Sequence, residues 1–257
     1  MVKIPLPAFS AICIDDGNTR CKVAIYRNGK LVRLHILPVR SSAALLAIKE
    51  INEATLPLIW SSVSDNRQVF EKISGRFSLA FEASAGLSLP LKNRYLSPGP
   101  GSDRLAAAVA VHHFFNGFPA LAIDAGTCLK FDFVNAAGAY LGGSISPGLQ
   151  MRFDAMHLGT GLLPALKPGT EKLILTGNDT ISAMRSGAMF GQVLEMEARI
   201  QRYRARYPKL RTVLTGGDLN NLPISLKKNI FAEPNLVLHG LFILLYHQPK
   251  IKALIHS

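Results

Sequence analysis

The first strand and turn of the chain recur about half-way along it. Residues 9–15 (FSAICID) are an apolar run that ends on Asp15 and predicts a buried strand, and a Gly-Asn turn and two further strands follow. Residues 119–124 (PALAID) end on Asp124, and Ala-Gly-Thr and a second strand pair follow. The two aspartates lie 109 residues apart, which is too long for a solenoid repeat and suits a duplicated domain. Strand–Asp–Gly turns also recur by chance, but the shared order of strand, Asp-x-Gly, Thr and hairpin favours duplication.

Helices and strands alternate in both halves. In the first half, CKVAIYR and KLVRLHIL are strands around an Arg-Asn-Gly-Lys turn, because Asn-Gly is the strongest short hairpin signal. Helices are expected at 41–53, 66–74 and 105–115, and strands at 57–63 and 77–83. In the second half, the hairpin strands are CLKFDFV and AYLGGSI, a further strand is expected at 212–215, and helices at 147–158, 180–206, 218–222 and 235–247. This alternation predicts an α/β fold with mixed sheets flanked by helices, in two domains, 1–117 and 118–257.

Composition narrows the function classes. The 257 residues are 48% hydrophobic, which excludes a disordered chain, and the net charge of +12 points to nucleic acid, an anionic membrane or anionic small substrates. The longest apolar stretch, 236–246, is about half of the roughly 20 residues that a membrane span needs, so we expect a buried helix and no membrane segment. The first ten residues contain no apolar run long enough for a signal peptide, so we expect none, and three cysteines without CxxC spacing are typical of a cytoplasmic protein.

One loop carries a signal for anion binding, whereas two familiar nucleotide motifs, GxxxxGK[ST] and GxGxxG, are absent from the sequence. The seven histidines have no HExxH or CxxC partner, so a structural zinc is not expected. In residues 15–22 (DDGNTRCK), Gly17 lets the backbone approach an anion, and Asn18, Thr19 and Lys22 add donors and charge. A hairpin turn of these residues needs no ligand, so the loop alone does not establish a phosphate site.

The second loop, 124–127 (DAGT), would face the first if a pseudo-twofold axis relates the two halves. Two opposed Gly-Thr hairpins, each after a strand-end carboxylate, would clamp a polyphosphate and leave the carboxylates to hold a metal ion or a water. This arrangement resembles the actin, sugar-kinase and chaperone-ATPase superfamily. The resemblance implies two duplicated ribonuclease-H-like (actin-like ATPase) domains.

Further motifs narrow the resemblance to the type III pantothenate kinase family. They are DDGNTRCK (15–22), PLKNRY (90–95), GSDR (101–104), DAGT (124–127), GGSISPG (142–148), TGLLP (160–164), Thr180 ahead of SGAMFG (186–191), TGGD (215–218) and NLVLHGL (235–241). Any one motif is a weak signal. The ordered set runs through nearly the whole chain in the family's order and is specific.

The resemblance implies the ATP-dependent phosphorylation of pantothenate to 4′-phosphopantothenate, the first step of coenzyme A biosynthesis, by a cytoplasmic homodimer with Mg²⁺ accompanying ATP. The residues implied to bind ATP are Asp15, Asp16, Gly17, Asn18, Thr19, Arg20, Cys21, Lys22 and Thr127. Those implied to bind pantothenate are Tyr95, Gly101, Ser102, Asp103, Arg104 and Thr180, the last supplied by the second subunit. Asp103 would be the catalytic proton acceptor, and Asp124 would bind potassium or ammonium.

Elementary chemistry supports the pantothenate side independently. The Pro/Gly cluster at 98–101 excludes a helix there, and Ser102 is a predicted N-cap. A helix start beside Arg104 suits the carboxylate of pantothenate, and Asp103, kept ionised there, is the natural partner of its hydroxyl. The alternative is that Asp103 only caps the helix and that Arg104 pairs with it.

Lys130 departs from the family pattern. The second loop continues as Cys128-Leu129-Lys130, where small or apolar residues and Thr are usual. A lysine here could contact the phosphates or point to solvent from an alternating strand. Asp132 falls on the same face of that strand and is a candidate partner.

Two other functions compete with the kinase. A nucleic-acid-associated transcriptional accessory factor of the same family would use the positive charge, and residues 199–211 (RIQRYRARYPKLR) are basic with interleaved tyrosines. That stretch also fits an ordinary solvated helix end, which we favour, and nucleic acid stays an open alternative partner. The third candidate is another small-molecule kinase or phosphatase of the superfamily, against which the GSDR and NRY segments argue.

Overall fold

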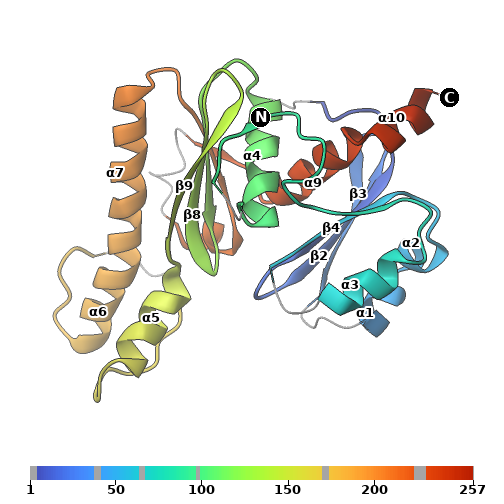
Figure 1. The fold of residues 1–257 in the computed structure, drawn as a ribbon. Helices are drawn as coiled ribbons and strands as arrows, with labels where there is room; N and C mark the ends of the chain where they lie inside the picture. Colours follow the sequence, from blue (N-terminus) through green and yellow to red (C-terminus); the bar gives the residue numbers. More distant parts are fainter. Residues whose placement is uncertain are drawn as a thin grey trace. The chain divides into compact units, whose positions relative to one another are not determined.

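A computed structural model describes residues 5–37, 42–63, 67–96, 99–169, 174–222 and 230–256 (Figure 1). Ser41 and Asn66, the first residues of two predicted helices, lie outside the described residues. The chain forms two compact units. The first unit contains the described residues up to Gly117, then 134–142, and those from Asn235 onward; the second contains 118–133 and the described part of 143–234.

A five-stranded mixed sheet forms the centre of the first unit. Its strands are β1 (Ala11–Asp16), β2 (Cys21–Arg27), β3 (Lys30–Leu37), β4 (Leu58–Ser62) and β5 (Ala80–Glu82), in the order β3-β2-β1-β4-β5. Strands β1, β2 and β3 are antiparallel neighbours, whereas β1, β4 and β5 run parallel. Asn28 and Gly29 have φ values of 48° and 73°, the backbone that a tight hairpin turn requires, so the predicted Asn-Gly hairpin is confirmed.

Helices cover both faces of this sheet (Figure 1). They are α1 (Ser42–Leu46), α2 (Lys49–Glu53), α3 (Arg67–Ser74), α4 (Ser102–Phe114), α9 (Leu236–Tyr246) and α10 (Pro249–His256). Ile12 and Ile14 alternate toward α1, α2 and α3, with Leu45 and Phe70 in the same core cluster. Helices α4 and α9 pack against each other and against the sheet. The helix predicted at 41–53 is divided at Ile48, which has an extended backbone.

The second sheet has six strands, in the order β11-β10-β7-β8-β9-β6. They are β6 (Lys92–Asn93), β7 (Ala120–Ala125), β8 (Cys128–Val134), β9 (Ala139–Pro147), β10 (Arg211–Thr215) and β11 (Phe231–Ala232). The order β9-β8-β7-β10-β11 repeats that of β3-β2-β1-β4-β5, and β7, β10 and β11 are parallel as β1, β4 and β5 are. The two halves therefore share one strand arrangement, as a duplication requires. The assignment of the domains to 1–117 and 118–257 stays a prediction.

Helix α7 (Gly191–Arg206) lays Val193, Met196 and Ile200 on the apolar side chains of β7 and β8. It follows α6 (Thr180–Arg185) and one π-helical turn, Ser186–Phe190, so the helix predicted at 180–206 is present with an interruption. Helix α5 (Leu149–Leu158) shares a smaller core with these two segments. A 3₁₀ turn at Gly217–Asn221 follows β10. None of the helices in the described residues is long and apolar enough to cross a membrane.

Candidate active site

The first predicted phosphate loop joins β1 to β2. The strand register sets Asp15 opposite Lys22, and the backbone N–H of Gly17 donates to the carbonyl oxygen of Arg20 at 3.1 Å, which closes the turn. The tip of the loop, residues 18–20, is exposed. Cys21 is different, because its side chain is buried in the apolar core of the first unit. The loop therefore offers backbone and polar tip residues to a ligand, and Cys21 can take part through its backbone.

Two serines that the sequence analysis did not single out hold the end of this strand. Strands β1 and β4 are parallel, and their register pairs Asp16 with Ser62. The hydroxyl of Ser62 donates to Oδ2 of the buried Asp16 at 2.9 Å, and the hydroxyl of Ser61 lies 2.9 Å from that of Ser102. Helix α4 is thus tied at its first residue to the strand beside the loop. In the sequence, the one sign of these contacts is that Ser61 and Ser62 end an otherwise apolar strand.

The N-cap of helix α4 lies one residue earlier than predicted. Gly101 is the N-cap, with no side-chain capping hydrogen bond, and Ser102 is the first helical residue. The prediction of Ser102 as the N-cap was wrong because its hydroxyl is engaged with Ser61. Asp103 lies in the first turn, where the exposed backbone N–H groups favour a negative charge. Its Oδ1 accepts the backbone N–H of Arg104 at 2.8 Å.

The guanidinium of Arg104 is buried, with 6% of the residue exposed, and is bound to Tyr95. Its Nη1 donates to the tyrosine hydroxyl at 3.1 Å, and its central carbon lies 5.3 Å from the centre of the ring. The Tyr95 ring stacks on that of Tyr140 at 6.0 Å, and Gly142, at a φ of +88°, lies so close that a Cβ there would be 3.0 Å from the ring. The structure therefore brings Tyr95 and the GSDR segment together. The alternative, in which Asp103 only caps the helix and Arg104 pairs with it, stays open.

The second predicted loop has a basic side chain at its carboxylate. Nζ of Lys130 lies 2.7 Å from Oδ2 of Asp124. Thr127 is exposed, and its carbonyl oxygen accepts the backbone N–H of Gly148 at 3.2 Å. This ion pair reaches across the hairpin to Asp124, and the pairing of Lys130 with Asp132 that strand alternation suggested stays a prediction. No set of three or more His, Cys, Asp or Glu side chains suited to a metal ion occurs within the described residues.

Two glycines bring other segments against this loop. A Cβ on Gly148 would lie 2.0 Å from the carbonyl oxygen of Gly126, and one on Gly216 would lie 2.2 Å from that of Ala125. Gly216 also has a φ of +105°, which favours glycine. The GGSISPG and TGGD motifs thus support the second loop by close backbone approach. Asp218, which follows, has a raised pKa because burial disfavours its charged form, and the nearby Asp124 adds to that effect.

Thr180 opens helix α6 and is exposed. The residue before it, Asp179, forms a capping box with Ser182, whose backbone N–H donates to Oδ1 of Asp179 at 2.9 Å. These hydrogen bonds lower the pKa of the Asp179 carboxyl. The position of Thr180 is therefore fixed by a regular helix start, and its side chain is accessible to a ligand or a second subunit.

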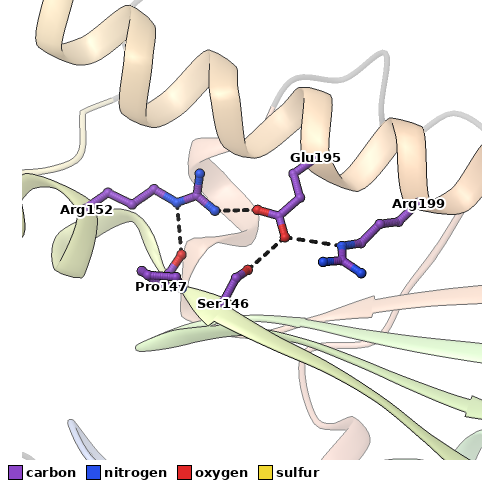
Figure 2. Close-up of polar contacts among 5 residues, drawn as sticks. All are labelled: Ser146, Pro147, Arg152, Glu195 and Arg199. Atoms are coloured by element: carbon purple, nitrogen blue, oxygen red, sulfur yellow. Dashed lines mark hydrogen bonds and ion pairs between the residues drawn. The ribbon is translucent and has the colours of Figure 1, made fainter.

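A cluster of charged side chains links α5 to α7 in the second unit through ion pairs and hydrogen bonds (Figure 2). The carboxylate of Glu195 accepts from Arg152 at 2.5 Å, from Arg199 at 3.2 Å and from the hydroxyl of Ser146 at 2.8 Å. Arg152 also donates to the carbonyl oxygen of Pro147 at 2.9 Å, beside Gly148. Burial opposes the charge of Glu195, but the hydrogen bonds and charges of its partners outweigh it and lower the pKa of the carboxyl. The sequence analysis did not predict this cluster, although Ser146 and Pro147 belong to the GGSISPG motif.

The sequence model described as "Type III pantothenate kinase" matches residues 11–202. The chain belongs to this family. A type III pantothenate kinase of Porphyromonas gingivalis is 36% identical over 237 residues, which are 90% of this chain and 95% of the relative. One of Bacteroides fragilis is 36% identical over 242 residues, 93% of this chain and 99% of the relative. The family predicted from the ordered motifs is thus confirmed.

Solved structures confirm the fold of this pantothenate kinase family member. A protein of Campylobacter jejuni, titled as a Baf family transcriptional activator, superposes with a TM-score of 0.59 at 14% identity, covering 93% of this chain and 99% of that one. MreB 5 of Spiroplasma citri, solved with AMPPNP, superposes with a TM-score of 0.52 at 11% identity, covering 96% and 98%. At such identities these likenesses show the fold alone, which is the predicted actin-like ATPase fold.

Proposed function

We propose that this chain transfers the γ-phosphoryl group of ATP to the primary hydroxyl of pantothenate, giving 4′-phosphopantothenate for coenzyme A biosynthesis. Family membership supports the reaction class. The observation that carries the substrate is the buried Arg104, held by Tyr95 at the start of α4. A buried guanidinium at a helix N-terminus suits a carboxylate, which pantothenate has at one end.

The residues around this helix start have distinct roles in the proposed reaction. Arg104 and the first backbone N–H groups of α4 bind the carboxylate of pantothenate and so orient the molecule. The hydroxyl of Tyr95 accepts a hydrogen bond from the guanidinium of Arg104 and holds it in place. Asp103 accepts the proton of the attacking hydroxyl. Its carboxylate lies in the first helical turn, close to the exposed backbone N–H groups. A weak base suffices, because phosphoryl transfer depends chiefly on positioning and charge neutralisation.

The nucleotide side uses both loops. Residues Asp15 to Lys22 offer backbone N–H groups, polar tip residues and one lysine to the phosphates, and Thr127 adds the second loop. Magnesium bound to ATP supplies further positive charge to the transferring phosphoryl group. The resemblance also implies potassium or ammonium at Asp124, which is the position where the structure has the ammonium group of Lys130.

The test is a coupled ADP-release assay with pantothenate, ATP and Mg²⁺. Asp103→Asn keeps the size of the side chain and removes its basicity, so we expect kcat to fall by about 10²-fold or more with little change in KM for ATP. Asp154→Asn, on the exposed face of α5, is the matched control and should keep the wild-type rate. A wild-type enzyme inactive with pantothenate would refute the substrate, and full activity of Asp103→Asn would refute its role.

A homodimer is part of the proposal. Large apolar side chains are exposed on α5, on the loop after it, on α6 and on α7, all in the second unit. They are Met151, Leu158, Leu162, Ile181 and Leu194, with Leu162 96% and Leu158 81% exposed. Large apolar side chains left exposed on these elements favour a protein partner, and a second copy would bring its own Thr180, on α6, to the same elements. Sedimentation at twice the mass of 27.9 kDa is the expected result, and a strict monomer would contradict it.

The competing nucleic-acid function finds less support. The tyrosines interleaved with the arginines of 199–211 face the protein: Tyr203 and Tyr207 lie 5.0 Å and 4.6 Å from the ring of Phe133. They are therefore not presented for stacking on bases. Arg199 is bound to Glu195. DNA retention that falls steeply with salt and is lost when 199–211 are neutralised would restore this function. We also propose a cytoplasmic location, which fractionation would test.

A further inference from the structure

The ion pair of Lys130 and Asp124 conflicts with the cation site that the family resemblance implies. Their charged atoms lie 2.7 Å apart, and their side chains are only 17% and 18% exposed. A lysine ammonium in this position is therefore a fixed component of the loop and not a solvated surface charge. The expected ligand of potassium or ammonium already holds a cation that belongs to this chain.

The backbone of two glycines lies close to the other oxygen of Asp124. The backbone of Gly216 lies against it, since a Cβ on that residue would be 2.6 Å from Oδ1, and a Cβ on Gly126 would be 3.4 Å from the same atom. One oxygen of the carboxylate thus faces Lys130 and the other faces glycine backbone. Within the described part of the chain, no set of three or more acidic, His or Cys side chains is placed to hold a metal ion.

We propose that the ammonium group of Lys130 replaces the external monovalent cation, so that this kinase needs neither potassium nor ammonium. The ε-ammonium of lysine has the charge of both ions and the N–H donors of ammonium itself. A second cation beside it would meet electrostatic repulsion. Because the group is covalently attached, it is present at the loop without any dependence on salt concentration. The inference rests on the proposed kinase function for the step that it affects.

The first experiment measures the rate of wild-type enzyme with potassium, with ammonium and with tetramethylammonium chloride at one ionic strength. We expect the three rates to agree within about twofold, because Lys130 supplies the cation in every salt and electrostatic screening is the same at one ionic strength. Lys130→Met keeps the length of the side chain and removes the charge. In tetramethylammonium chloride, the rate of Lys130→Met should be about tenfold or more below that of wild type, because one charged hydrogen bond is lost. In ammonium or potassium chloride, the rate of this variant should return to the wild-type value. Lys167→Met, an exposed lysine of the same unit, should resemble wild type in every salt.

The second experiment needs no catalysis. The rise in melting temperature caused by a non-hydrolysable ATP analogue should be equal in the three salts for wild type, and larger in ammonium or potassium for Lys130→Met. Lys130→Arg retains a cation and should remain insensitive to salt if Lys130→Met does not fold.

A wild-type rate or analogue effect that rises severalfold with potassium would refute the inference, as would a loss in Lys130→Met that ammonium does not restore. The two proposals can fail separately. Wild-type enzyme inactive in all three salts would refute the kinase proposal, and the melting experiment would still decide the role of Lys130.

Discussion

Replacing Gly240 with alanine has two opposite effects on stability: alanine favours the helix, but its Cβ collides with a neighbouring helix. Gly240 lies within α9, and a Cβ added there would be 1.8 Å from the carbonyl oxygen of Ala106 on α4 and 2.5 Å from its carbonyl carbon. An ordinary contact needs about 1.7 Å more, if non-bonded heavy atoms lie about 3.5 Å apart. The backbone of α9 fixes the position of the Cβ, and the oxygen belongs to the backbone of α4, so no rotamer change can relieve the contact and the helices themselves must separate.

The magnitude follows from two opposing terms. Overpacking of a tight interface costs about 1–3 kcal/mol, and contact with rigid backbone places this case near 3. Alanine is favoured over glycine in a helix by about 1 kcal/mol. The net loss is about 2 kcal/mol, which for a chain of this size lowers Tm by about 4–8 °C.

The assay compares Gly240→Ala with Gly191→Ala by thermal and urea unfolding. Gly191 is also helical, with φ −57° and ψ −41°, but a Cβ there would meet nothing within 4 Å. Propensity then acts alone and should raise Tm by about 2–4 °C. If Gly240→Ala were as stable as Gly191→Ala, the close contact of α4 and α9 would not be the determining feature of this interface.

Two further substitutions test the polar contacts. Tyr95→Phe removes the hydroxyl that accepts from Arg104 but keeps the ring, so KM for pantothenate should rise by up to about tenfold, with KM for ATP as the internal control; an unchanged pantothenate KM would contradict the assigned pocket. Glu195→Gln should lower stability at neutral pH by about 1 kcal/mol, as expected for partly exposed ion pairs. Because the pKa of Glu195 is lowered by folding, its contribution is complete above the unfolded pKa of about 4.3 and is lost as pH falls through the folded value. The free energies of unfolding in urea of wild type and Glu195→Gln should therefore converge at low pH. A difference that persists there would contradict the ion-pair explanation.

Much of the fold could be predicted because its signals are local. The Asn-Gly turn at 28–29 and the apolar strands on either side specify a hairpin by themselves, and the same holds for the hairpin around Gly138, whose φ is +72°. Strands β6 and β11 were missed because each has two residues and exists only through pairing with a distant strand. Helix α10 was also not predicted.

The contacts of the candidate site were harder to predict than the fold, because they join residues that are far apart in the sequence. Ser62 meets Asp16 only through the parallel register of β1 and β4. The ion pair of Lys130 with Asp124 joins β8 to β7 across their turn. Alternation along one strand compares only residues of that strand and could not predict this contact. Glu195 gathers residues up to 49 positions away through long side chains. Motif order identified the family and left these contacts to the structure.

The first unit is built from both ends of the chain, since α9 packs on α4 and on the sheet that the N-terminal residues form. During synthesis, the N-terminal half must therefore wait with an incomplete core until residues 236–246 have been made. Chains that stop before α9 would expose the apolar face of α4 and become substrates for chaperones or proteases. The core around the N-terminal sheet is therefore closed only by residues more than 100 positions further along the chain, so its formation depends on long-range contacts.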